Sequence, residues 1–376
     1  MVDTPLDDEA APSEVLVERV GALGRLTLNR PRAINALNHS MVRTLAAALD
    51  EWRDDDAVRT VLLTGAGERG LCAGGDIVAI YRAVLDGRDE AIRFWADEYR
   101  LDAAIARYPK PYVSLMDGLV LGGGIGLSAH GGIRVVTERT RVGMPEVSIG
   151  FFPDVGGTYL LSHAPGELGT HLGLTGGTAS GADAVAIGLA DHFVPGDRLA
   201  ELVAALETRD AAEAIAEFAG EPPASELMAR RAWIDAAYAG DDAEAIVERL
   251  AASSEPAARD AAATIRSKSP TSVALTLAAL RRAAALPSLE AALDQDFRIA
   301  TRISRGAEVV EGIRAQVIDK DRAPRWSPAT LAEVTAEDVE RYFAPLGRSG
   351  LGPSDLDPSD LGAAELGLAA PAPIRS

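Results

Sequence analysis

Two acidic side chains that lie eight residues apart, Glu146 and Asp154, are the part of this sequence best suited to chemistry. A proline, Pro145, directly precedes Glu146 and fixes the backbone from which its side chain projects. A carboxylate held in this way can act as a general base or as a nucleophile when its surroundings tune its pKa and exclude bulk water. Taken alone, a Pro-Glu pair is more often an N-cap or a surface acid. The role of Glu146 therefore depends on which other groups the fold places beside it.

Two Gly-rich turns upstream, Cys72–Asp76 and Leu121–Gly126, could supply backbone N–H donors to the same place. Attack on a thioester carbonyl places negative charge on its oxygen, which donors aimed in advance stabilise. Glycine leaves room for the acyl group and permits φ > 0, and the dipole of a following helix adds positive potential. A tight turn without chemistry is the alternative, because single Gly-rich turns often match by chance.

Taken in order, these motifs resemble the crotonase superfamily, which contains the enoyl-CoA hydratases and isomerases. Residues 141–157, RVGMPEVSIGFFPDVGG, are very similar to the pattern of its 3-hydroxyisobutyryl-CoA hydrolase subfamily, and the resemblance extends from about residue 14 to 328. It implies a crotonase-like α/β fold, a ββα superhelix (spiral), followed by an α-helical C-terminal region. The same resemblance places the two oxyanion-binding amides on Gly75 and Gly123 and the catalytic acids on Glu146 and Asp154.

The segment from Asn29 to Leu37 resembles the stretch with which crotonases wrap coenzyme A. Arg32 would meet a phosphate as a charge-assisted donor, and a basic, solvated loop is the alternative. The positions that the resemblance assigns to coenzyme A binding are Arg32, Ala33, Leu37, Gly74, Asp76 and Gly122. Coenzyme A is part of the thioester substrate, so no separate cofactor is expected.

Two positions separate hydrolysis from water addition. Hydratases typically have glycine where this chain has Asp154, and they carry a second catalytic glutamate where it has Gly126. The resemblance therefore implies hydrolysis of a short β-hydroxyacyl-CoA thioester, with 3-hydroxyisobutyryl-CoA of valine breakdown as the substrate. The alternatives are an enoyl-CoA hydratase or isomerase of fatty acid oxidation and a non-catalytic acyl-CoA-binding protein. Asp154 could also cap a helix that starts near Gly156.

Composition excludes several other classes of function. A formal charge of −19 argues against a nucleic-acid partner and against an anionic membrane surface, both of which need clustered Lys and Arg. The single cysteine, Cys72, excludes an internal disulfide and suits a reducing, cytoplasmic location. It is expected to be a buried small hydrophobe rather than a nucleophile, because no histidine lies at a motif-like spacing. The five histidines show no metal-binding pattern, so no metal is expected.

Alternating strand, Gly-rich turn and helix patterns predict a layered α/β core over residues 14–200. Within it we expect a hairpin at 15–28, a helix capped by Ser40, and a helix over 91–106. Strands are predicted at 60–64, 111–116 and 133–137. Residues 201–330 are Ala-rich and predict a separable helical portion. Residues 1–13 and the extension 331–376, from about 343, are expected to be largely disordered. Whether the chain forms a homo-oligomer stays open.

Overall fold

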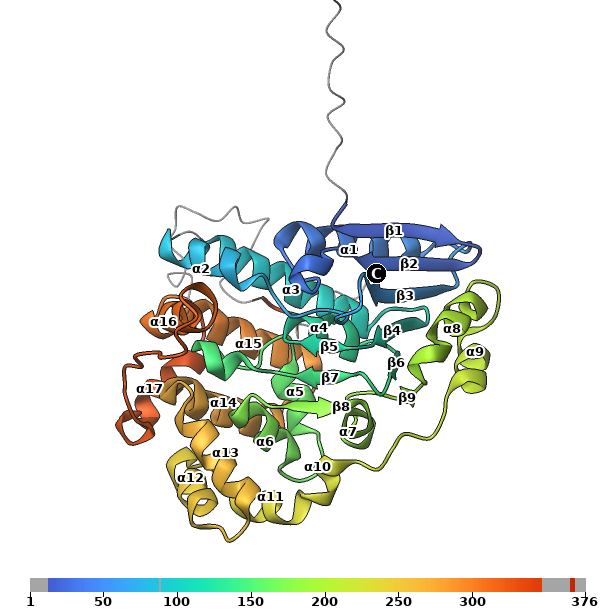
Figure 1. Cartoon of the computed structure of the whole chain (residues 1–376). Helices are drawn as coiled ribbons and strands as arrows, with labels where there is room; N and C mark the ends of the chain where they lie inside the picture. Colours follow the sequence, from blue (N-terminus) through green and yellow to red (C-terminus); the bar gives the residue numbers. More distant parts are fainter. Residues whose placement is uncertain (1–12, 88, 347–365, 369–376) are drawn as a thin grey trace, which may run out of the picture.

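The computed structural model describes residues 13–87, 89–346 and 366–368 of the chain. Its centre is a six-stranded sheet in the order β1-β2-β3-β4-β6-β9, in which β1 and β2 are antiparallel and the other pairs parallel (Figure 1). A smaller sheet has the order β5-β7-β8. The strands are β1 Val15–Val20, β2 Leu23–Leu28, β3 Thr60–Gly65, β4 Tyr112–Met116, β5 Leu119–Leu121, β6 Ile133–Val136, β7 Arg141–Gly143, β8 Thr178–Ser180 and β9 His192–Phe193.

The central strands are covered on both faces, which explains their continuous apolar sequences. On β3, Val61 and Leu63 belong to the main hydrophobic core, whereas Leu62 between them packs into a second cluster on the opposite face. This alternation is the two-residue period of a strand applied to two buried faces. Leu202 and Phe218 fill the second cluster from α8 (Leu199–Leu206) and α9 (Ala211–Phe218).

The small sheet continues beyond β5 through two single bridges. Cys72 pairs with Val120 of β5, and Leu37 pairs with Gly75, both in parallel. Each of three successive turns of chain thus gives a strand to the large sheet, a strand or bridge to the small one, and then a helix. The turns are β2, Leu37 and α1 (His39–Arg53); β3, residues 72–75 and α2 (Ile77–Leu85); and β4, β5 and α4 (Gly123–Ala129). This is the ββα repeat that the sequence resemblance implies.

Both helices predicted in the core are present. The predicted helix over 91–106 is α3 (Glu90–Ala106), which packs against α1, α2 and α4. The cap of α1 differs from the prediction: Asn38, and not Ser40, accepts the N–H of Met41. Asn38 has the extended backbone of an N-cap, whereas Ser40 already lies within the first turn, so its hydroxyl bonds the Asn38 side chain.

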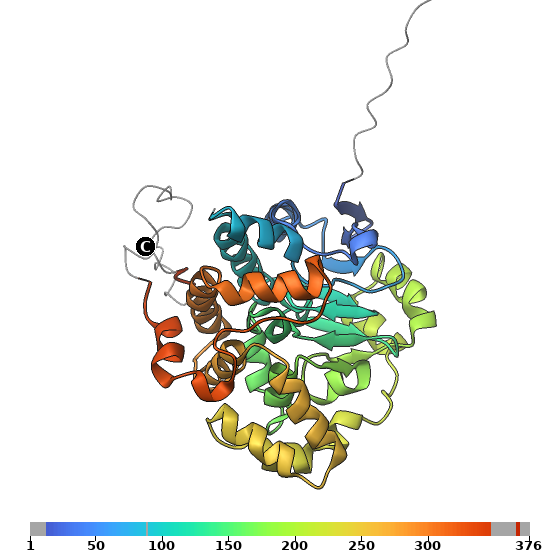
Figure 2. The same ribbon diagram turned by 60° about the vertical axis from the view of Figure 1, so that its left-hand side comes forward.

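The C-terminal part is helical, as predicted, but it is not a separable unit. In Figures 1 and 2 its orange helices lie beside the N-terminal half, and α14, α15 and α16 contact α5, α3 and the short 3-10 helix η2 respectively. One hydrophobic core runs through both parts, because apolar faces of the later helices pack on the N-terminal half as well as on one another. Bounds are η2 Glu146–Ile149, α5 Gly157–Ser162, α6 Leu168–Thr175, α7 Gly181–Ala186, α10 Glu226–Ala229, α11 Arg231–Tyr238, α12 Ala243–Ala252, α13 Pro256–Arg266, α14 Pro270–Ala283, α15 Leu289–Ile303, α16 Ala307–Ile313 and α17 Ala336–Phe343.

The two segments predicted to be disordered lie mostly outside the described residues, namely at 1–12, 347–365 and 369–376. The extension from residue 331 does contain one described helix, α17, which packs against α14 and α15. Within the described part of the chain, no helix combines the length and the apolar character that crossing a bilayer requires.

Candidate active site

The two Gly-rich turns lie side by side, as the sequence predicts. The N–H of Leu121 donates to the carbonyl of Cys72 at 2.9 Å, which aligns one turn with the other. Gly75 and Gly123 then line one cavity of about 40 Å³, just ahead of α2 and at the start of α4. Gly122 has φ +49° with ψ −121°, a backbone conformation that favours glycine.

The N–H of Gly75 has no hydrogen-bond acceptor within the part of the chain that the structure describes. In the parallel bridge to Leu37, the bonds are made by the N–H groups of Leu37 and Asp76, at 2.8 and 2.7 Å to the carbonyls of Gly74 and Leu37. The N–H of Gly75 itself faces away from Leu37 in such pairing. Gly123 is the first residue of α4, so its N–H has no acceptor within the helix. Both predicted oxyanion donors are thus available at one cavity.

Glu146 lies at the start of η2 with only 8% of its surface exposed, so it is neither a surface acid nor a side-chain cap. Its carboxylate lies against Gly122, where an added Cβ would be 2.5 Å from Oε1. Glu146 Oε2 has no hydrogen-bond partner among the described residues. Burial, followed by the negative charge of Asp154, raises the pKa of Glu146 well above its ordinary value. The result is an acid at the cavity wall that holds its proton more tightly than an ordinary glutamate.

Asp154 lines the same cavity, so the eight-residue spacing does bring the two acids together. Its side chain does not cap α5, whose N-cap is Gly156 without a side-chain bond. Instead Asp154 Oδ2 accepts the hydroxyl of Tyr99 at 2.8 Å. Burial raises the pKa of Asp154 to about 7, and the Tyr99 hydrogen bond opposes part of that rise. This acid can give or accept a proton near neutrality.

Two further buried acids on α3, which the sequence analysis missed, face the glycines of α4. Glu98 lines the cavity, and its Oε1 occupies the space that a side chain at Gly123 would need. One turn later, both oxygens of Asp102 lie 2.8 Å from where a Cβ of Gly126 would be. Burial raises the pKa of both acids well above their ordinary values. The signal was present: 98 and 102 continue the stripe of Ala91 and Trp95 on the buried face of the helix.

Apolar side chains from distant parts of the chain enclose the acyl end. Trp95 stacks on Phe151 with 5.2 Å between ring centroids. Val309 and Ile313 of α16 also line the cavity, so the helical C-terminal region supplies part of the wall. A cavity of about 40 Å³ has room for only a few water-sized groups and therefore favours a short acyl chain.

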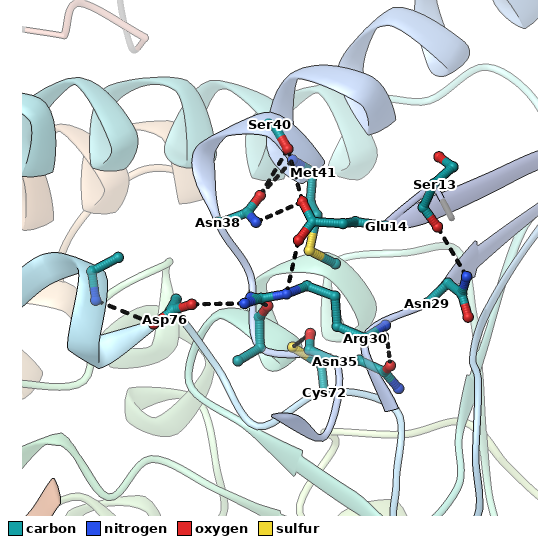
Figure 3. Close-up of polar contacts among 12 residues, drawn as sticks. Ser13, Glu14, Asn29, Arg30, Asn35, Asn38, Ser40, Met41, Cys72 and Asp76 are labelled. Carbon is teal, nitrogen blue, oxygen red and sulfur yellow. Dashed lines mark hydrogen bonds and ion pairs between the residues drawn. The ribbon is translucent and has the colours of Figure 1, made fainter. Parts of the chain in front are cut away.

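The loop predicted to wrap coenzyme A is fixed to the same turn by a polar network (Figure 3). Arg30 bonds Glu14, Asp76 and the carbonyl of Ala36, at 3.0, 2.9 and 2.5 Å. Asp76 also caps α2 by accepting the N–H of Ala79, which gives this predicted binding residue a structural task.

Leu37 and Asp76 line a second cavity of about 160 Å³ that shares Ile80 and Phe94 with the first. A second cavity next to the first is well placed to hold the arm of a coenzyme A ester. Arg32 and Ala33 lie outside both cavities, on the exposed side of the loop, and Gly122 contacts Glu146 as described. The contacts of all six residues with coenzyme A stay predictions.

Cys72 is fully buried and burial raises the pKa of its thiol to about 12, so it is not a poised nucleophile. Its thiol donates to the carbonyl of Asn35 at 3.3 Å. The side-chain amide of Asn35 in turn donates to the carbonyls of Ala66, Gly70 and Leu71. These bonds hold the loop that contains Asn35 against the chain before Cys72. Cys72 therefore has a packing role, as expected.

Comparison with known proteins gives consistent matches over most of the chain. The family model described as enoyl-CoA hydratase/isomerase matches residues 23–343. The mitochondrial 3-hydroxyisobutyryl-CoA hydrolase of Gallus gallus is 39% identical and covers 92% of this chain and 91% of its own length.

Two crystal structures match closely in shape. One, described as a carnitinyl-CoA dehydratase from Mycobacterium thermoresistibile, is 55% identical with a TM-score of 0.86, over 91% of this chain and 99% of that one. The other, an enoyl-CoA hydratase from Rhodobacter sphaeroides 2.4.1, is 42% identical with a TM-score of 0.85, over 89% and 98%. The names of the relatives thus agree on acyl-CoA esters and differ in the reaction.

Proposed function

The chain belongs to the enoyl-CoA hydratase/isomerase family, and from that premise we propose that it hydrolyses short β-hydroxyacyl-CoA thioesters, with 3-hydroxyisobutyryl-CoA as the main substrate. The predicted crotonase-like fold is confirmed by the two similar crystal structures. One observation carries the proposal: Glu146 and Asp154 line the same small cavity as Gly75 and Gly123. Valine breakdown is the process in which such a thioester would arise.

The thioester oxygen would lie between the N–H groups of Gly75 and Gly123, which stabilise the charge that develops there. Glu146 would either attack the carbonyl carbon, expelling the thiolate and forming a mixed anhydride that water then cleaves, or take a proton from an attacking water. Its raised pKa makes it a stronger base in either case. Asp154 would bind the substrate hydroxyl or protonate the departing thiolate, for which a pKa of about 7 is suitable.

A dehydratase or hydratase is the second candidate, because the 55% identical crystal structure carries that description. Water addition or removal in the family uses a second glutamate on the helix after the triple glycine, and this chain has Gly126 there. The Asp102 carboxylate already occupies the space beside Gly126. The position that would hold the second acid is therefore closed to a side chain, which favours hydrolysis.

The deciding experiment compares products from a panel of CoA thioesters: 3-hydroxyisobutyryl, 3-hydroxybutyryl, crotonyl and carnitinyl. Released thiol is trapped with a chromogenic disulfide, and formation or loss of the conjugated enoyl group is followed separately by absorbance. We expect thiol release that is fastest with 3-hydroxyisobutyryl-CoA, without interconversion of enoyl and hydroxyacyl esters. Enoyl formation without thiol release would favour the dehydratase. Tight binding of every ester with neither reaction would favour a non-catalytic protein.

A further inference from the structure

Asp154 depends on one neighbour that neither the sequence motifs nor the relatives' names point to. Tyr99 comes from the middle of α3 and is completely buried, with its ring edge-on to Phe297 of α15. Its hydroxyl donates to Asp154 Oδ2 at 2.8 Å. Among the described residues this is the only side-chain hydrogen bond that Asp154 receives. The phenol thus supplies the side-chain donor to this carboxylate, beside a backbone N–H of Asp154 itself.

The other charged groups around this pair are acids. Asp154 acts electrostatically on Glu98, Asp102, Glu146 and Asp296, each of which is fully or almost fully buried. Asp296 also faces Tyr99, as does Glu98. Neighbours of this kind, together with burial, favour the protonated form of a carboxyl group. Among the described residues, the hydrogen bond from Tyr99 is the one side-chain interaction that favours the ionised form of Asp154.

Two hydrogen bonds also fix the backbone next to Asp154. Val155 has φ +51°, a left-handed conformation that a β-branched residue rarely adopts. Its carbonyl lies 2.7 Å from His130 Nε2, and the next N–H, of Gly156, donates to Asp296 Oδ2 at 2.9 Å. Burial lowers the pKa of His130 to about 4, so a neutral imidazole donates this bond at neutral pH. These contacts fix the backbone from which the Asp154 side chain projects.

From this geometry we propose that Tyr99 is a positioning residue for the reaction: its phenol donates the hydrogen bond that orients the Asp154 carboxyl group toward the thioester. The proposal rests on the proposed function, in which Asp154 exchanges a proton or binds the substrate hydroxyl. It extends that function by assigning the control of Asp154 to a side chain that does not line the cavity.

The test is Tyr99→Phe, with Tyr112→Phe as the matched control. Tyr112 is also buried, but its hydroxyl donates to the backbone carbonyl of Leu127 and not to Asp154. The pH dependence of kcat is measured with 3-hydroxyisobutyryl-CoA. Loss of a hydrogen bond to an ionised acceptor should move the limb that reports Asp154 to higher pH by about one unit. The direction is the same whether the protonated or the ionised form is active.

If the Tyr99→Phe protein folds poorly, a second measurement tests the same proposal. Global replacement of tyrosine by the more acidic 3-fluorotyrosine strengthens the donor without removing it and should move the same limb to lower pH. The Tyr112→Phe variant should leave the limb unchanged. If Tyr99→Phe leaves the limb unchanged, or moves it together with Tyr112→Phe, the proposal is wrong.

Titration of Asp154 can also be followed without turnover, by infrared difference spectra of the protonated carboxyl band against Asp154→Asn. An alkaline shift of this titration in Tyr99→Phe supports the role of Tyr99, and an unchanged titration overturns it. A wild-type protein that releases no thiol would overturn the proposed function alone, because the infrared titration still decides about Tyr99.

Discussion

At the scale of single residues, Glu146 is the side chain on which hydrolysis depends most. Glu146→Gln keeps the volume but removes the base, so we expect kcat for thiol release to fall by at least about a thousandfold. Binding of the CoA ester, measured by calorimetry, should change little. Glu18→Gln is the control, because Glu18 lies on β1 and its ion pair with Arg25 is partly exposed. Near-normal turnover by Glu146→Gln would contradict the assignment.

Gly126 gives a second prediction at this scale. Gly126→Ala would place a Cβ 2.8 Å from both Asp102 oxygens and 2.9 Å from Val155, in a region without free space. Such overpacking should lower the free energy of unfolding by about 1–3 kcal/mol. Gly132→Ala is the matched control, because its added Cβ meets nothing within 4 Å and its φ is not positive. Equal urea denaturation midpoints for the two variants would show that the acid does not occupy this space.

Residues in local motifs could be predicted from the sequence, and those that depend on helix orientation could not. Glu146, Asp154, Gly75 and Gly123 lie in short segments whose order is specific, and the fold brings them to one cavity. Glu98 is also at the cavity, yet an acid in a helix is normally expected to face solvent. Only the packing of α3 against the glycines of α4 shows that its side chain points inward.

At the scale of elements, Arg30 joins the loop before α1 to the start of α2. Arg30→Met should lower both stability and kcat/KM, because Asp76 loses its ion-pair partner and the adjacent Gly75 amide is held less firmly. The expected loss of stability is about 1.5–3 kcal/mol, since the lost hydrogen bonds join charged groups and Arg30 is only 23% exposed.

The control for Arg30 is Arg25→Met, which removes a more exposed ion pair with Glu18 and should cost less than about 1 kcal/mol. Urea unfolding and thiol release are measured on both variants. If kcat/KM falls equally in the two proteins, the connection from Arg30 to the Gly75 amide does not affect catalysis.

The spacing of apolar residues and the positions of glycines predict most helices and strands of the core. The two wrong predictions have identifiable causes. The cap of α1 was assigned to Ser40 because serine is a common N-cap, but the chain reaches helical geometry one residue after Asn38. The helical C-terminal part was expected to be separable because its composition changes sharply. Composition does not reveal that its apolar faces pack on α3, α5 and η2.

At the scale of the whole molecule, the buried acids make stability depend on pH. Burial raises the pKa of Asp154 from its ordinary value of 3.8 to about 7, so the folded protein binds more protons than the unfolded chain between these values. Stability should therefore be greatest at the acidic end of this window and fall as pH rises through it. Glu98 and Asp102, whose pKa values are also raised, act in the same direction.

Melting temperature measured across this pH range tests the prediction. Asp154→Asn should flatten the decline, because the amide does not titrate, whereas Asp50→Asn should not, since Asp50 is exposed on α1. A wild-type melting temperature that rises steadily with pH over the window would contradict the predicted sign.

The acyl pocket has one further consequence, which concerns synthesis and evolution. A nascent chain carries both amide donors and both acids long before the ribosome reaches Val309 and Ile313, so it cannot form a closed acyl chamber until its last third is made. One part of the wall around the acyl group is thus encoded far downstream of the residues that cleave the ester. Changes in the later part can alter which ester fits while the cleaving groups stay as they are.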